Sequence, residues 1–131
     1  GFLNYIYSTL ASLRNYQVIH IKEFGPLFSF TIANANQFGN NAYISPASDL
    51  QDGFLEAIQI KPSNRWSIVY LGISLFLKKV HLNSLVTIST VKSMQFHSSQ
   101  VIPYHLDGES LLLQPGTIVI QIQPASLLVV K

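Results

Sequence analysis

The chain has no cysteine among its 131 residues. Without thiols it can form neither a disulfide framework nor a thiolate zinc site, and a cysteine nucleophile is excluded. Charged side chains are also scarce, at 11% of the residues, where soluble domains usually have about a quarter. The net charge is +2, and the basic residues are scattered apart from the pair Lys78-Lys79. The sequence therefore lacks the basic stripe that would indicate a nucleic-acid partner.

Long hydrophobic runs are missing as well. The longest apolar stretch, residues 66–77, contains two serines and a glycine and has about half of the ~20 residues that a membrane span needs. The first residues do not resemble a signal peptide, and the lack of cysteine fits a reducing cytoplasm, so we expect a cytoplasmic location. The chain opens at Gly1-Phe2-Leu3 without a methionine, so we expect it to be part of a longer protein.

Hydrophobic residues make up 48% of the chain, and its length favours a single domain with a sizeable core. So few charges on the surface indicate a missing partner, which could be another domain, another subunit or an apolar ligand. The alternative is an ordinary β-rich domain whose surface is made of serine, asparagine and glutamine. Composition alone leaves both interpretations open.

The periodicity of apolar residues predicts mostly strands, with two helices. We expect the helices at residues 2–15 and 65–80, and the second should bury a stripe formed by Trp66, Val69, Ile73, Phe76 and Leu77. The expected strands are residues 17–23, 27–35, 54–60, 86–96, 101–106, 111–113, 118–123 and 127–130. The first two should form a hairpin that turns at Gly25-Pro26. Many short strands with regular turns predict a mainly β fold, a β-sandwich or open barrel decorated by two helices.

Four of the six acidic residues stand at two turns. Asp107 and Glu109 flank Gly108, between two strand-like runs. An Asp-Gly pair between apolar strands is a common hairpin turn, which is the simplest interpretation. Glu109 does not improve a turn, however, and it closely precedes three leucines. A carboxylate at the rim of an apolar surface is a candidate general base, because partial burial raises its pKa towards the working pH.

The other acidic turn contains Asp49 and Asp52, directly before Gly53. A carboxylate with neighbouring backbone carbonyls is an oxygen set that hard cations accept. The alternative is a solvated turn in which Asp52 bonds its own backbone. The four histidines have no metal-ligand spacing, and the chain has neither a glycine-rich phosphate loop nor a nucleophile elbow.

Two ordered motifs resemble a known family. Residues 32–56 contain Ile-Ala-Asn, Phe-Gly and then Tyr-Ile-Ser-Pro-Ala-Ser-Asp-Leu-Gln-Asp-Gly-Phe-Leu-Glu, and residues 106–109 read Leu-Asp-Gly-Glu before a closing Pro-x-x-Leu-x-Val at 124–129. This order resembles the C-terminal domain of diacylglycerol-kinase-like lipid kinases, a family that includes bacterial lipid kinases and the sphingosine kinases. One departure is the loop at residues 38–41, which has a single glycine where the family has several.

The resemblance implies a cleft between two domains. An N-terminal domain would hold ATP through a Gly-Gly-Asp-Gly-Thr-type loop, and a C-terminal β-sandwich would bring the lipid. Since no such loop is present, residues 1–131 would be the C-terminal domain alone, inactive without the nucleotide-binding domain. The implied partners are a lipid substrate and that N-terminal domain, with ATP and Mg²⁺ as cofactors; contact with a membrane surface and a homodimer stay open.

The resemblance also assigns roles to single residues. Glu109 would be the base that takes the proton of the lipid hydroxyl, and Asp107 would assist through a metal-bound water or by orienting that base. A structural Mg²⁺ would take the Asp49 carbonyl, the Asp52 carboxylate and the Phe54 carbonyl. An apolar interior could accept an acyl chain, unless its residues simply pack the core; the candidates are Phe28, Phe30, Leu71, Leu75 and Leu112.

Two rival interpretations remain. An NAD-kinase-like domain would share the fold, but that family tends to have glutamine where this chain has Glu109. A non-catalytic binding module would use both acidic turns as ordinary hairpins.

Overall fold

The computed structural model describes residues 16–36, 42–46, 48–49, 52–106 and 109–123. These residues form a mainly β structure, as predicted, and the strands pair antiparallel. The elements in chain order are β1 (Ile19–Ile21), β2 (Gly25–Leu27), β3 (Ser29–Ala33), β4 (Leu55–Ile60), α2 (Arg65–Phe76), the 3₁₀-helix η1 (Val80–Leu82), β5 (Val86–Val91), β6 (Ser93–Ser98), β7 (Ile102–Leu106), β8 (Glu109–Leu113) and β9 (Gly116–Gln121). The helix expected at residues 2–15 and the strand expected at 127–130 lie outside the described residues.

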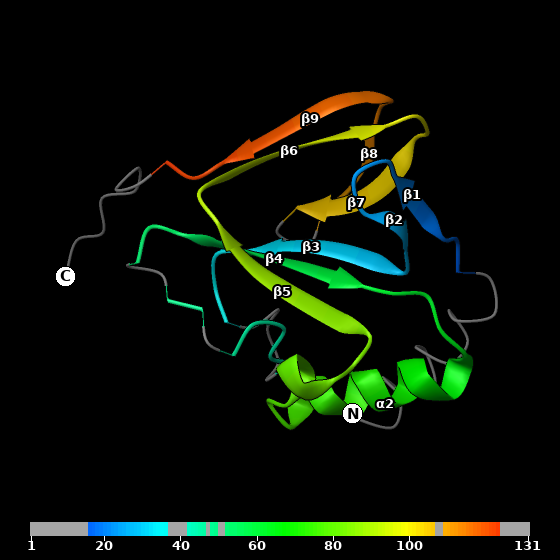
Figure 1. Cartoon of the computed structure of the whole chain (residues 1–131), viewed down its shortest axis with the longest axis vertical. Coiled ribbons are helices and arrows are strands. Elements are labelled where there is room, and N and C mark those ends of the chain that lie inside the picture. The colour runs from blue at the N-terminus through cyan, green and yellow to red at the C-terminus, as the bar shows by residue number, and fades with distance from the viewer. Residues whose placement is uncertain (1–15, 37–41, 47, 50–51, 107–108, 124–131) are drawn as a thin grey trace.

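A three-stranded sheet in the order β3-β4-β5 lies at the centre of the molecule. Three two-stranded ribbons, β1-β2, β6-β9 and β7-β8, lie on one side of it, and α2 and η1 cover the other side (Figure 1). The central strand β4 is therefore covered on both faces, and five of its six residues are buried. This is why its sequence contains more apolar residues than a half-exposed strand would need.

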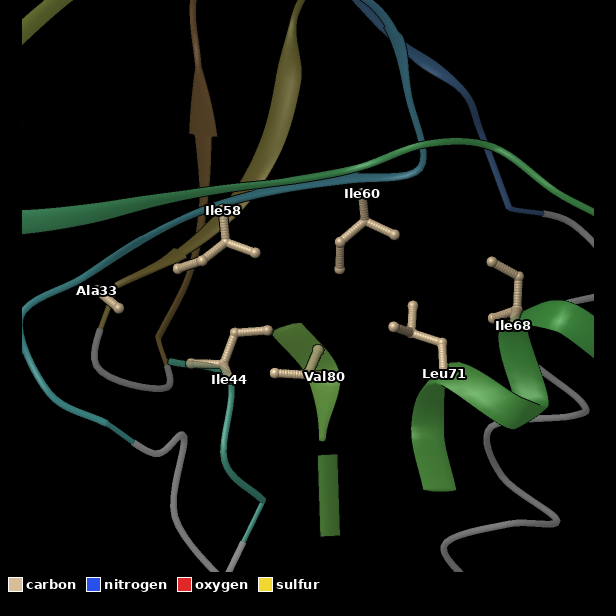
Figure 2. Close-up of a cluster of buried hydrophobic side chains, with 7 residues drawn as sticks. All are labelled: Ala33, Ile44, Ile58, Ile60, Ile68, Leu71 and Val80. Atoms are coloured by element: carbon tan, nitrogen blue, oxygen red, sulfur yellow. The ribbon is translucent and has the colours of Figure 1, made fainter. Parts of the chain in front are cut away.

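The core between the central sheet and α2, called here the helix-side core, is mainly aliphatic. Its buried members are Ala33, Ile44, Ile58, Ile60, Ile68, Leu71 and Val80. Figure 2 shows Ile58 and Ile60 reaching from the sheet towards Ile44, Val80 and Leu71. Burying each such side chain contributes about 1.5–3 kcal/mol, so this core provides much of the stability of the fold.

The core on the other side of the sheet, called here the sandwich core, contains aromatic rings. Its buried members are Ile21, Leu27, Phe96 and Ile102. The rings of Phe24, Phe30 and Phe96 pack against one another with centroids 5.2–6.1 Å apart. They join β3 of the central sheet to the β1-β2 and β6-β9 ribbons.

Several strand predictions were wrong in their bounds, and β8 and β9 each begin two residues before the expected start. The strand expected at residues 86–96 is interrupted at Lys92: β5 pairs with β4, whereas β6 pairs with β9 in another sheet. The chain thus turns a corner at Lys92, whose carbonyl accepts a hydrogen bond from the Ile122 N–H at 3.0 Å. The hairpin expected between residues 17–23 and 27–35 was also wrong, because β1 pairs with β2 and β3 pairs with β4. Gly25 and Pro26, the expected turn, belong to β2, and the turn precedes them. Gly25 adopts φ +77°, which suits glycine.

The second helix exists but is shorter than predicted. Asn64 caps its start by accepting a hydrogen bond from the Ser67 N–H at 3.0 Å. The helix ends at Phe76 because Lys78 adopts the left-handed conformation, φ +58°. The Lys78 and Lys79 N–H groups then bond the carbonyls of Leu75 and Ser74, which is a Schellman ending.

The buried stripe expected on this helix was wrong. The buried residues are Ile68, Leu71 and Ser74, whereas Trp66, Ile73 and Leu77 of the expected stripe are exposed. The pattern could not decide the orientation, because apolar residues surround the helix on all sides.

Candidate functional site

The acidic motif at residues 106–109 joins two paired strands. Leu106 at the end of β7 pairs with Glu109 at the start of β8, so two residues connect the strands. A two-residue connection is what the Asp-Gly pair predicts. Asp107 and Gly108 themselves lie outside the described residues, and Glu109 is a strand residue and not part of the turn.

One face of the β7-β8 hairpin carries a continuous apolar surface, called here the hairpin strip. Cross-strand partners share a face and side chains alternate along each strand, which fixes its members. They are Ile102, Tyr104, Leu106, Leu111 and Leu113. Ile102 is 7% exposed and belongs to the sandwich core, Tyr104 is 36% exposed and Leu106 is 59% exposed. The strip therefore runs from the core out to the surface.

Glu109 stands on the same face, at the outer end of the hairpin strip, directly across from Leu106. Its side chain is exposed. The expected place at the rim of an apolar surface is observed, whereas the expected partial burial is not. Within this chain the carboxylate is open to an incoming group.

His105 and Ser110 lie on the opposite face of the same hairpin. The Ser110 hydroxyl and His105 Nδ1 are 3.2 Å apart, within hydrogen-bonding distance, and both residues are exposed. The sequence alone did not predict this pair. Ser110 directly follows Glu109 in β8, and consecutive strand residues point to opposite faces, so the pair lies on the face away from Glu109.

The acidic turn before β4 is a local hydrogen-bonded structure. Asp52 Oδ1 accepts a hydrogen bond from the Phe54 N–H at 2.8 Å, and Gly53 adopts φ +72°. The backbone-bonding alternative for Asp52 is thus observed. Asp49 and Asp52 are exposed, and Lys92 Nζ lies 4.9 Å from the centroid of the Phe54 ring.

The donor set of this turn is suited to a hydrated hard cation. It offers a carboxylate with a second oxygen beside the bonded Oδ1, together with backbone carbonyls, and water would complete the coordination. Within the described ranges no group of three or more histidine, aspartate or glutamate side chains gathers as a metal cluster.

Two further carboxylates, those of Glu56 and Glu23, accept hydrogen bonds that the sequence did not predict. Glu56 in β4 is 9% exposed, and its Oε1 accepts a hydrogen bond from the Thr90 hydroxyl at 3.1 Å. A carboxylate within an apolar strand needs such a partner, which is the signal that could have found it. Glu23 Oε2 accepts a hydrogen bond from the His97 N–H at 3.1 Å, and this bond lowers the pKa of Glu23.

The residues proposed to accept an acyl chain do not share one cavity. Phe28, Leu71 and Leu75 pack in the helix-side core, and Phe30 packs in the sandwich core. Leu112 is exposed on the opposite face of the hairpin from Glu109. Phe28, Phe30, Leu71 and Leu75 therefore pack the two cores, as the alternative interpretation expected. The apolar surface that lies beside Glu109 is the hairpin strip. A shallow hollow elsewhere, beside His20 and His97, does not include either acidic motif.

Comparison with known proteins agrees with these features. The family model described as the YegS C-terminal NAD kinase beta sandwich-like domain matches residues 1–131. No curated protein matches the chain. No helix in the described part is both long and apolar enough to cross a bilayer. The family model matches the chain over residues 1–131, and the antiparallel sheets agree with the fold that it describes. The chain therefore belongs to the family of NAD-kinase-like β-sandwich domains that form the C-terminal part of YegS-type lipid kinases.

Proposed function

We propose that this domain binds the lipid and supplies the catalytic base of an ATP-dependent kinase that phosphorylates a lipid hydroxyl. The observation that carries the proposal is the hairpin strip with Glu109 at its outer end. A diacylglycerol or a sphingoid base has the matching chemistry, since each combines a long apolar chain with a hydroxyl group.

The apolar part of such a substrate would lie along Leu111 and Leu106, which are 40% and 59% exposed. Moving these side chains out of water is favourable by about 25 cal/mol for each Å² of apolar surface covered. A chain held in this way brings its polar end to Glu109, because Glu109 is the next residue on that face. The strip thereby orients the hydroxyl, and orientation supplies much of the catalysis in phosphoryl transfer.

In the chemical step Glu109 accepts the hydroxyl proton while the lipid oxygen attacks the γ-phosphorus of ATP. A new P–O bond forms to the lipid, the bond to the β-phosphate oxygen breaks, and ADP leaves. Asp107 would orient Glu109 or hold a metal-bound water. ATP would be bound mainly by an N-terminal domain, which would also cover the exposed outer end of the hairpin strip.

A structural Mg²⁺ is proposed for the other acidic turn. Its ligands would be the Asp49 carbonyl, the Asp52 carboxylate and the Phe54 carbonyl, with waters completing the shell. The ion would brace the segment that leads into β4 and would take no part in proton transfer.

The test is Glu109→Gln in the kinase that contains this domain together with its nucleotide-binding domain. Amide replaces carboxylate at nearly constant shape, so lipid phosphorylation should fall by about 10²–10⁴-fold while ATP affinity stays unchanged. Ser110→Ala is the matched control, because Ser110 is exposed on the opposite face of the same strand. Activity near the wild-type level in Glu109→Gln would refute the assigned role and favour a non-catalytic binding module.

A further inference from the structure

The outward side of α2 is apolar and aromatic. Trp66, Tyr70, Ile73 and Leu77 follow one another at spacings of four, three and four residues, so they line one side of the helix, called here the outer face of α2. Trp66 is 80% exposed and Tyr70 is 64% exposed, and the other two are also exposed. The opposite side, with Ile68 and Leu71, packs in the helix-side core.

An apolar surface is unusual on the solvent-exposed side of a helix. No charged residue occurs from Trp66 to Leu77, so the helix is apolar on all sides, although the residues that the structure describes cover only one of them. A helix that is apolar all round is normally buried on both sides. A contiguous exposed patch of this kind marks a surface that binds something.

Basic residues stand at both ends of the outer face. Arg65 begins the helix, and Lys78 and Lys79 directly follow its last turn. All three side chains are exposed. The sequence contains no aspartate or glutamate between Glu56 and Asp107, so no acidic side chain of this segment neutralises them. The patch is therefore apolar at its centre and cationic at its ends.

We propose that the outer face of α2 docks on the surface of a bilayer that contains anionic phospholipid. The helix has 12 residues and is about 18 Å long, too short to span the hydrocarbon layer. Lying flat, it would place its apolar side chains among the upper acyl chains. Tryptophan and tyrosine favour the headgroup level, and lysine and arginine are attracted by anionic headgroups.

This surface is distinct from the proposed catalytic site. In Figure 1 the central sheet separates α2 from the β7-β8 hairpin that carries Glu109. Docking needs neither ATP nor phosphoryl transfer, so it can be measured on the chain alone. Its failure would leave the role of Glu109 untouched, and loss of that role would leave docking untouched.

The chain contains its own reporter, because Trp66 is its only tryptophan. Vesicles with about one-third phosphatidylglycerol in phosphatidylcholine should shift the Trp66 emission to shorter wavelength, and brominated acyl chains should quench it. Pure phosphatidylcholine vesicles should bind much more weakly, since each basic residue near an anionic surface contributes about fivefold. Flotation of the vesicles gives the bound fraction independently.

Two double variants keep the reporter and divide the interaction. Tyr70→Ser with Leu77→Ser should weaken vesicle binding by at least about tenfold through lost apolar contact. Arg65→Glu with Lys79→Glu should weaken binding to anionic vesicles by at least about 25-fold and leave the residual binding to neutral vesicles unchanged. Val119→Ser is the matched control, because Val119 on β9 is exposed to the same degree as Tyr70.

Several results would overturn the proposal. Absence of a spectral shift with anionic vesicles would exclude docking through this face. Binding that both double variants retain at full strength would place the membrane contact elsewhere on the chain. If the chain self-associates in sedimentation, and Tyr70→Ser with Leu77→Ser makes it monomeric without altering vesicle binding, the outer face of α2 is an interface between copies.

Discussion

The two sides of the central sheet differ in how completely they are closed. On the helix side, Ile44, Ile58 and Val80 are at most 1% exposed, and α2 and η1 cover them. On the sandwich side, the core continues into the hairpin strip, where exposure rises steadily from Ile102 to Leu106. One sheet thus separates a closed core that stabilises the fold from an open one that ends at Glu109. The stability of the fold and the proposed chemistry therefore depend on different faces of β3-β4-β5.

Removing the same side-chain volume from each side of the sheet should have the largest effect. Ile58→Ala should lower the free energy of unfolding by about 2–5 kcal/mol, because it leaves a cavity where nothing can relax outward. Leu111→Ala in the hairpin strip should cost less than about 1 kcal/mol, because its side chain is already 40% exposed. Urea denaturation of both variants measures the difference. Equal losses would mean that the two sides are closed alike.

The strands and the acidic motifs were largely predictable from the sequence, for physical reasons that are local. Alternation located β4, and the Asp-Gly pair at 107–108 predicted the two-residue connection that the Leu106–Glu109 register shows. Of the three leucines that suggested an apolar surface beside Glu109, Leu111 and Leu113 share its face and Leu112 does not.

Other features depend on distant contacts and left no local signal. The alternating pattern continues through Lys92, so only the pairing of β5 with β4 and of β6 with β9 reveals the corner. The orientation of α2 was undecidable, because both of its sides are apolar and the sheet it packs on chooses between them. The hydroxyl that donates a hydrogen bond to Glu56 belongs to Thr90, which is 34 positions away in the sequence.

The end of α2 offers a smaller test on the closed side. Lys78 holds φ +58°, a conformation that costs a residue with a Cβ about 1 kcal/mol or more. Lys78→Gly should therefore be more stable than Lys78→Ala by about 1 kcal/mol, although both variants lose the contact of Lys78 Nζ with the Tyr43 ring at 4.1 Å. Thermal unfolding of the pair isolates the backbone effect. Identical melting temperatures would show that the left-handed ending is not retained in solution.

The smallest effect is expected on the open side, where Glu23 joins the β1-β2 ribbon to β6. The hydrogen bond from the His97 N–H lowers the pKa of Glu23, and the nearby Lys22 charge lowers it further to a lesser degree. Because the folded pKa lies below the unfolded one, the stabilisation is present above the ordinary glutamate value of 4.5 and is lost as the pH falls through the folded value. Glu23→Gln should accordingly reduce the loss of stability on acidification, seen as a smaller difference between urea midpoints at pH 6 and pH 3. Lys22→Gln should change this difference less, since the backbone hydrogen bond is the larger cause. A greater effect of Lys22→Gln would mean that charge, and not the strand-to-strand bond, controls this contact.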